Sequence, residues 1–189
     1  MINYVAYRKF ATLKNGKRVM FRFLNDQDRE ALIQMFHEAP EEDVRFLKQD
    51  VKDLKVVNSW VDHLNYRKVL PLLAVDLENN RIIADVTLHP GKHAAKHIGE
   101  IRIFVSRPFR NLGLGSLMLE EVLNLALQEN LMWVKAEILA DHKKVIKAFK
   151  AKGFEQKCLL DDYFIRKDGV THDVILMMRP VVKRDEAEF

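Results

Sequence analysis

Cysteine and long apolar runs are what this sequence has least of. The one cysteine, Cys158, excludes an internal disulfide framework and a cysteine-based zinc cluster, and it is typical of a reducing cytosol. No run of roughly 18 residues is apolar and free of charge, as a membrane-spanning helix requires. Arg8 and Lys9 are not followed by the apolar stretch of a signal peptide. We therefore expect a cytoplasmic protein without a membrane partner.

Proline and glycine are scarce as well, and no linker or internal repeat divides the chain. Because 48% of the 189 residues are hydrophobic, the chain is able to bury a sizeable core. We expect one domain over residues 1–183 and a solvated tail over 184–189. The net charge of +4 suits an anionic ligand, but no aromatic and basic stacking platform accompanies it, so nucleic acid is not an expected partner.

Hydrophobic periodicity predicts an α/β domain. The expected strands cover 19–24, 69–75, 81–88, 98–105, 132–139, 154–164 and 174–178. The expected helices are one capped by Asn25 or Asp26, two pieces between 41 and 66, one over 116–128 and one over 143–152. Turns are expected at Asn79-Asn80 and at 167–169. Hairpins followed by strand-helix-strand crossovers imply a mixed, mostly antiparallel central sheet flanked by helices on both faces.

The segment 104–118 carries the strongest chemical signal, because a strand there passes through a glycine turn into a helix. Gly113 and Gly115 let backbone N–H groups face a common point beside the positive helix end, so a diphosphate is the natural guest. Arg110 would supply a cation beside it. A Walker A loop would need lysine after Gly115, and a dinucleotide fingerprint would need a small residue in place of Met118. A tight connection that only relieves crowding is the structural alternative.

Two motifs, in the same order along the chain, resemble the GNAT superfamily of N-acetyltransferases. Arg110-Asn-Leu-Gly-Leu-Gly115 matches the motif Gln/Arg-x-x-Gly-x-Gly/Ala at every fixed position. The segment 136–142, followed by Phe149-Lys-Ala-Lys-Gly-Phe154, is similar to the family's Asn…Lys-x-Gly-Phe region. Within the family the layout is most similar to the protein-lysine acetyltransferase branch. The resemblance implies direct transfer of an acetyl group from acetyl-CoA to a primary amine, through a tetrahedral intermediate.

The same resemblance implies a coenzyme site around the glycine turn. Phe104 and Val105 would face the pantetheine arm and the acetyl group, and His142 and Phe149 would complete the contacts. The backbone amides that would hold the pyrophosphate belong to Leu112, Gly113, Leu114, Gly115 and Ser116.

Glu100 is the expected general base. An amine with a pKa of about 10.4 is protonated at neutral pH, so a base is useful, and many relatives carry a glutamate at this position. The alternative for Glu100 is a strand carboxylate paired with Arg102 or Lys96. The backbone N–H of Val105 is the donor that the family implies for the oxyanion.

Two positions depart from the family pattern. Phe149 stands where relatives often have the tyrosine that protonates the leaving thiolate, so water, Tyr163, Cys158 or the released amine would have to supply that proton. His142 stands in place of an asparagine and still offers a hydrogen-bond donor. An acyl-CoA sensor without catalysis is therefore the second hypothesis, and a basic nucleic-acid binder is the third. The acceptor amine and the oligomeric state stay open, a homodimer included.

Two further clusters of polar residues have simpler explanations. His89, His93 and His97 recur every four residues, but Pro90 and Gly91 interrupt any helix, so we expect a solvated loop and no metal site. Acidic residues at 41–43 and 161–162 are expected at the surface, with a cationic amine as their alternative partner.

Overall fold

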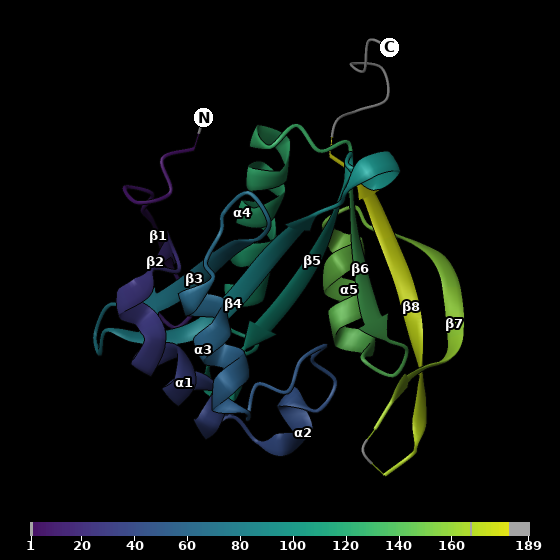
Figure 1. Cartoon of the computed structure of the whole chain (residues 1–189), viewed down its shortest axis with the longest axis horizontal. Helices are drawn as coiled ribbons and strands as arrows, with labels where there is room; N and C mark the ends of the chain where they lie inside the picture. Colours follow the sequence, from purple (N-terminus) through teal and green to yellow (C-terminus); the bar gives the residue numbers. More distant parts are fainter. Residues whose placement is uncertain (1, 167, 182–189) are drawn as a thin grey trace. The chain divides into compact units, whose positions relative to one another are not determined.

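The computed structural model describes residues 2–166 and 168–181, and the predicted tail over 184–189 lies outside them. Within the described residues, eight strands form a sheet in the order β1-β2-β3-β4-β5-β6-β8-β7 (Figure 1). The pair β5–β6 is parallel, whereas the pairs β1–β2, β2–β3, β6–β8 and β7–β8 are antiparallel. This confirms the predicted α/β class with a mixed, mostly antiparallel sheet.

The helices and strands follow one another in the predicted order, with β1 added before them. The strands are β1 (Lys9–Thr12), β2 (Arg18–Phe23), β3 (Leu70–Asp76), β4 (Arg81–Pro90), β5 (Ile98–Val105), β6 (Trp133–Leu139), β7 (Glu155–Ile165) and β8 (Thr171–Pro180). The helices are α1 (Arg29–Glu38), α2 (Glu41–Val44), α3 (Leu54–Asp62), α4 (Leu114–Gln128) and α5 (Lys143–Ala151). None of the helices in this part of the chain is long and apolar enough to cross a membrane.

Contacts divide the chain into two compact units. The first combines the residues up to Thr87 with Ile103–Met118, and the second combines Leu88–Arg102 with the residues from Leu119 onward. Strands β4 and β5 and helix α4 contribute residues to both units. The single domain expected over 1–183 stays a prediction.

The core of the first unit lies where α1 and α3 pack beside the strands. In Figure 1 these two helices lie side by side, and their apolar faces contribute Leu32, Phe36 and Val57 to one buried cluster. The ring of Phe36 packs 5.3 Å from that of Phe104, a β5 residue of the same unit. Asn25 caps the short 3-10 helix Asp26–Asp28 that leads into α1, because its side chain accepts a hydrogen bond from the amide of Gln27 at 2.9 Å, whereas the N-cap of α1 itself is Asp28.

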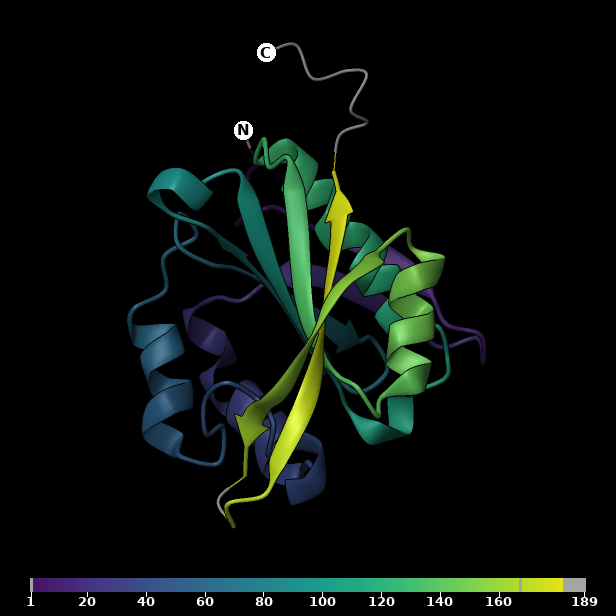
Figure 2. The ribbon, with the colours of Figure 1, turned by 90° about the vertical axis from the view of Figure 1, so that its right-hand side faces the viewer.

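The second unit contains the β7–β8 hairpin, which Figure 2 shows as a long twisted ribbon. Its pairing shifts register between Leu160 and Phe164, where Asp162 adopts a φ of +52°. The carboxylate of Asp173 accepts a hydrogen bond from the Asp162 amide at 3.0 Å and so supports this bulge. The predicted turn at 167–169 includes residue 167, which lies outside the described residues, and its Gly169 has a φ of +82°.

One strand and several boundaries differ from the sequence-based expectation, and β8 extends beyond the predicted 174–178 at both ends. The strand β1 was not predicted, because its four residues are mostly exposed and show no apolar alternation; pairing with β2 forms it. Helix α3 ends at Asp62 rather than near Tyr66, whose hydroxyl donates a hydrogen bond to the carbonyl of Leu24. Helix α4 begins at Leu114, two residues before the expected start, since Gly115 is accommodated in its first turn.

Candidate functional site

A sharp turn carries the chain from the end of β5 into α4. A short 3-10 helix, Arg107–Phe109, follows the strand, and Asn111 and Gly113 then adopt φ values of +62° and +87°. Side chains with a β-carbon are strained in this left-handed region, asparagine less than most, so glycine is favoured at position 113 for the backbone alone. The amide of Lys14 donates to the carbonyl of Leu112 at 3.1 Å and ties the turn to the loop between β1 and β2.

The first turn of α4 presents backbone N–H groups at the predicted phosphate site. Amides in a first helical turn have no acceptor inside the helix, and they carry the positive end of the helix dipole. A β-carbon built on Gly115 would find no atom nearer than Cγ2 of Val105, at 3.7 Å. The protein's own packing therefore does not require glycine there. Helix N-terminal amides beside a residue without a side chain fit the diphosphate of a coenzyme.

Arg110 is held in place by two partners within the same unit. Its Nε donates to the carbonyl of Val105 at 2.9 Å, and its terminal nitrogens lie 3.0 Å from the carboxylate oxygens of Asp43. Arg107 donates to the same carboxylate. Burial alone would raise the pKa of Asp43, but the hydrogen bonds and charges of the two arginines outweigh it and lower that pKa below its ordinary value. The cation expected at Arg110 is thus already paired with an anion.

Glu100 belongs to the second unit and lies between two cations. Its side chain is 15% exposed, with one oxygen 2.7 Å from Nε of Arg102 and the other 3.5 Å from Nζ of Lys135. Lys135 also lies 3.3 Å from Glu137. The pair with Arg102 is the structural alternative stated for this residue, so Glu100 makes the ion pair whether or not it also serves as a base.

Strands β5 and β6 are paired over only part of their length. The parallel register joins Ile98–Glu100 with Trp133–Lys135, whereas β5 continues to Val105 and β6 continues to Leu139. Backbone groups of β5 beyond Glu100 are therefore not part of this ladder.

The remaining predicted site residues differ in how far their side chains are exposed. Phe104 is buried against Phe36, which leaves its backbone as the part that a ligand would contact. In the second unit, His142 is the N-cap residue of α5 and its side chain is 54% exposed. Phe149 is buried and packs against Phe154 at 4.9 Å.

Comparison with known proteins decides the family. The sequence profile described as the acetyltransferase (GNAT) family matches residues 29–154, two thirds of the chain. The chain belongs to this family. It is an acetyl-CoA-dependent N-acetyltransferase, and the turn described above lies within the matched residues.

Solved structures share the fold of this acetyltransferase at low sequence identity. Ribosomal-protein-S5-alanine acetyltransferase from Vibrio fischeri is 15% identical with a TM-score of 0.76, covering 86% of this chain and 92% of that chain. The GNAT domain of PAT from S. lividans is 21% identical with a TM-score of 0.75, covering 92% and 96%. Ribosomal-protein-alanine N-acetyltransferase from Brucella melitensis is 20% identical with a TM-score of 0.74, covering 85% and 98%.

The histidine series of the acetyltransferase lies at a hairpin, where the amide of Gly91 donates to the carbonyl of Ile98 at 2.8 Å. His93 begins a 3-10 helix with a φ of +51°, so the three histidines do not share a helix face. The described residues contain no group of three or more histidine, cysteine or acidic side chains that could hold a metal ion.

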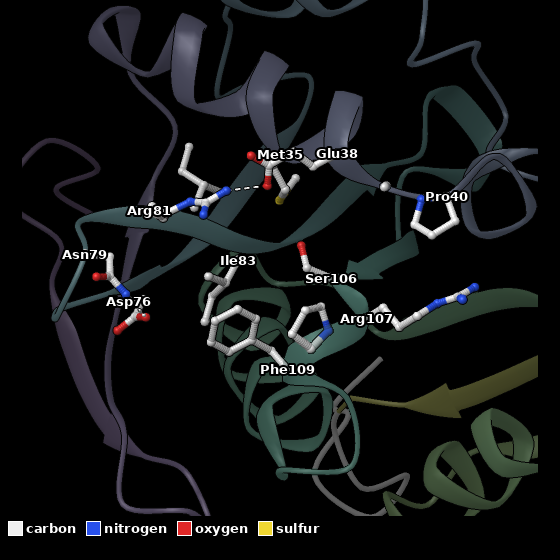
Figure 3. Close-up of a pocket in the computed structure, with 13 residues that line it drawn as sticks. Met35, Glu38, Pro40, Asp76, Asn79, Arg81, Ile83, Ser106, Arg107 and Phe109 are labelled. Atoms are coloured by element: carbon white, nitrogen blue, oxygen red, sulfur yellow. Dashed lines mark hydrogen bonds and ion pairs between the residues drawn. The ribbon is translucent and has the colours of Figure 1, made fainter.

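A cavity in the first unit was not predicted (Figure 3). It has a volume of about 170 Å³ and lies between the end of α1, the turn between β3 and β4, and the segment after β5. Glu38 and Arg81 form an ion pair at its wall, and the side chain of Arg107 extends away from it. None of the predicted site residues lines this cavity. No motif in the sequence marks it, because its lining comes from three separate segments.

Asp85 was also missed. It lies half-buried in β4, and burial raises the pKa of its carboxyl to about 7. A signal was present in the sequence, because Asp85 interrupts the otherwise apolar run from Ile82 to Val86.

Proposed function

We propose that this acetyltransferase transfers the acetyl group directly from acetyl-CoA to a primary amine of a protein or a small molecule. The observation that carries the proposal is the start of α4, where the first helical turn presents its N-terminal amides and Gly115 carries no side chain beside them. The amides of Leu112, Gly113, Leu114, Gly115 and Ser116 would hold the pyrophosphate. The backbone at Phe104 and Val105, with His142 and Phe149, would make the remaining coenzyme contacts. The coenzyme supplies a thioester as the acetyl donor.

Glu100 is our candidate for the base that makes the amine neutral. Glu100 is the last β5 residue in the parallel pairing with β6. Its side chain is 15% exposed, and its two oxygens contact Arg102 and Lys135. An incoming ammonium group would compete with these two cations for the carboxylate, because all three are charge-assisted donors. The N–H of Val105 is the candidate donor to the developing oxyanion.

The proton for the leaving thiolate does not come from Phe149, which has no ionisable group and is buried against Phe154. Tyr163 and Cys158 are both exposed on β7. We infer that the proton removed from the amine, or water, serves this step, because neither route needs an ionisable group at position 149.

A protein amine is supported as one acceptor class, because two of the similar structures are named as acetyltransferases of ribosomal-protein alanine. The resemblance to the lysine acetyltransferase branch supports a protein lysine as another. A small-molecule amine is the remaining class, and a screen across the three would separate them.

The decisive test is calorimetric titration with acetyl-CoA of wild type and three glycine variants. Gly115→Ala adds a β-carbon with ordinary contacts and φ compatible with a helix, so we expect it to fold normally and to bind acetyl-CoA at least tenfold more weakly. Gly113→Ala adds strain of about 1–2 kcal/mol in the left-handed region as well. Gly169→Ala is the matched control, since its φ of +82° brings the same strain in the β7–β8 turn.

If Gly169→Ala weakens acetyl-CoA binding as much as Gly113→Ala, the turn is not the coenzyme site. If wild type binds acetyl-CoA but acetylates no amine in the screen, the chain is the non-catalytic sensor. A wild type that does not bind acetyl-CoA refutes the proposed site.

A further inference from the structure

Helix α2 is too short to hold itself in place. It has four residues, and isolated helices shorter than about 12 residues are marginal in water. Val44 is buried in the core of the first unit, and the stretch that follows as far as Asp53 has only turns and bends. The position of α2 therefore depends on its side-chain contacts with the rest of the unit.

Asp43 makes polar contacts that fasten α2 to the segment after β5, and Glu42 adds one to Arg107. The side chain of Asp43 is 9% exposed and accepts from Nε and Nη2 of Arg107 at 3.1 and 2.9 Å. It also accepts from Nη1 of Arg110 at 3.0 Å. The two arginines stand 64 and 67 residues away in the sequence, one at the start of the turn and one in the phosphate-binding motif.

Arg110 extends this contact to the backbone of β5. Because its Nε is committed to the carbonyl of Val105, the guanidinium bridges the end of β5 and the carboxylate of Asp43. A planar guanidinium with several fixed donors suits such a bridge, whereas a single ammonium group does not. Movement of the turn is thus passed to α2 through Arg110, beside the contacts of Arg107 with the same helix.

We propose that Asp43 is a positioning residue that couples coenzyme binding at the turn to the ordering of α2. The inference rests on the proposed coenzyme site. A ligand that holds the amides of the turn fixes Arg110, and Arg110 then fixes Asp43 and α2. Because coupling between two sites is reciprocal, an acceptor that orders the segment around α2 strengthens coenzyme binding by the same factor.

Hydrogen exchange followed by mass spectrometry tests this coupling, with coenzyme A as the probe. In wild type, saturating coenzyme A slows exchange both in peptides covering 110–117 and in peptides covering 41–53. In Asp43→Asn, which removes the charge that both arginines share, we expect coenzyme A to bind about tenfold more weakly. At saturation the variant keeps the protection of 110–117 and loses that of 41–53.

Glu42→Gln is the matched control. Glu42 pairs with Arg107, whereas the contact with Arg110 is made by Asp43. Glu42→Gln removes the same charge from α2 and keeps the protection of 41–53. Arg110→Gln breaks the link from the other side and loses that protection, which guards against a folding defect peculiar to Asp43→Asn. Thermal unfolding checks that each variant is folded.

Three results overturn the coupling. The coupling is absent if coenzyme A protects 110–117 but not 41–53 in wild type. It does not run through Asp43 if the Asp43→Asn variant keeps the protection of 41–53. Faster exchange in 41–53 after coenzyme A binds wild type shows that the phosphates draw Arg110 away from Asp43, the opposite of a brace. Failure of wild type to bind coenzyme A overturns the proposed site instead, so the two failures are distinguishable.

Discussion

Two carboxylates, Asp43 on α2 and Glu100 on β5, each lie between two cations, yet their surroundings differ. The cations of Glu100 are its neighbour two residues along the strand and a lysine on the paired strand, each reaching one oxygen. The cations of Asp43 are two arginines from a distant segment, and both of its oxygens are engaged by forked guanidinium groups. A carboxylate held by separate single contacts is easier to free than one held by two forks.

This difference fits the two proposed roles, a general base for Glu100 and a positioning residue for Asp43. A proposed base must exchange its partners during each catalytic cycle, whereas a brace must keep them. Partial burial is similar in the two cases, with side-chain exposures of 15% for Glu100 and 9% for Asp43. Burial alone therefore does not distinguish the two roles, and the geometry of the cations does.

The largest expected effect is on Glu100. Under general-base catalysis, Glu100→Gln lowers the acetylation rate by about two to four orders of magnitude, because glutamine accepts no proton from the amine. Acetyl-CoA affinity should stay near that of wild type, which titration calorimetry measures. Undiminished transfer by the variant would show that Glu100 is a structural partner of Arg102 and Lys135 only.

Asp85 is the next case, a carboxylate whose pKa only burial shifts. Its pKa is about 7 in the folded protein against an ordinary value of 3.8. The contribution of protonated Asp85 to the free energy of unfolding is therefore fully present below pH 3.8 and is lost as pH rises through about 7. The loss is at most about 4 kcal/mol, at 1.36 kcal/mol for each unit of pKa. Urea unfolding should find Asp85→Asn more stable than wild type at pH 8 by about 2 kcal/mol, and much closer to it at pH 4. Equal gains at both pH values would contradict titration of Asp85.

A smaller effect separates charge from geometry at Arg110. Arg110→Lys keeps the positive charge but cannot reach both Val105 and Asp43, so we expect acetyl-CoA to bind about tenfold more weakly. Arg107→Lys changes a side chain that is 51% exposed and should weaken acetyl-CoA binding about threefold or less. Titration of both variants gives the comparison. Wild-type affinity in Arg110→Lys would mean that charge alone matters there.

The smallest effect is expected at an exposed pair with the same spacing as Glu100 and Arg102. Glu155 and Lys157 are also two residues apart on one strand, with a 2.7 Å contact that lowers the pKa of Glu155. Glu155→Gln should leave the melting temperature and the acetylation rate at wild-type values, because solvent screens exposed pairs. A measurable loss of activity in Glu155→Gln would show that removing any such paired carboxylate lowers the rate, so the loss in Glu100→Gln would not indicate a base.

Local patterns in the sequence were enough to predict most of the fold, including the turn at which the candidate site is proposed. The range of β5 was predicted at both ends, because its apolar alternation is bounded by turn residues. The glycine turn was predictable because Gly113 serves a local backbone geometry that precedes a helix. Strand β1 was not predictable, since its partner β2 and not its own composition makes it a strand.

The sequence by itself determined the local geometry at the turn, since glycine spacing and a following helix are short-range features. Only the tertiary structure decided what surrounds the charges. The sequence suggested a surface role for Asp43, and folding places it against arginines more than sixty residues away. Ion pairing and cavities arise from segments distant in the chain, so the partners of Arg110 and the cavity at Arg81 had no local signature, whereas Asp85 was marked only by its place in an apolar run.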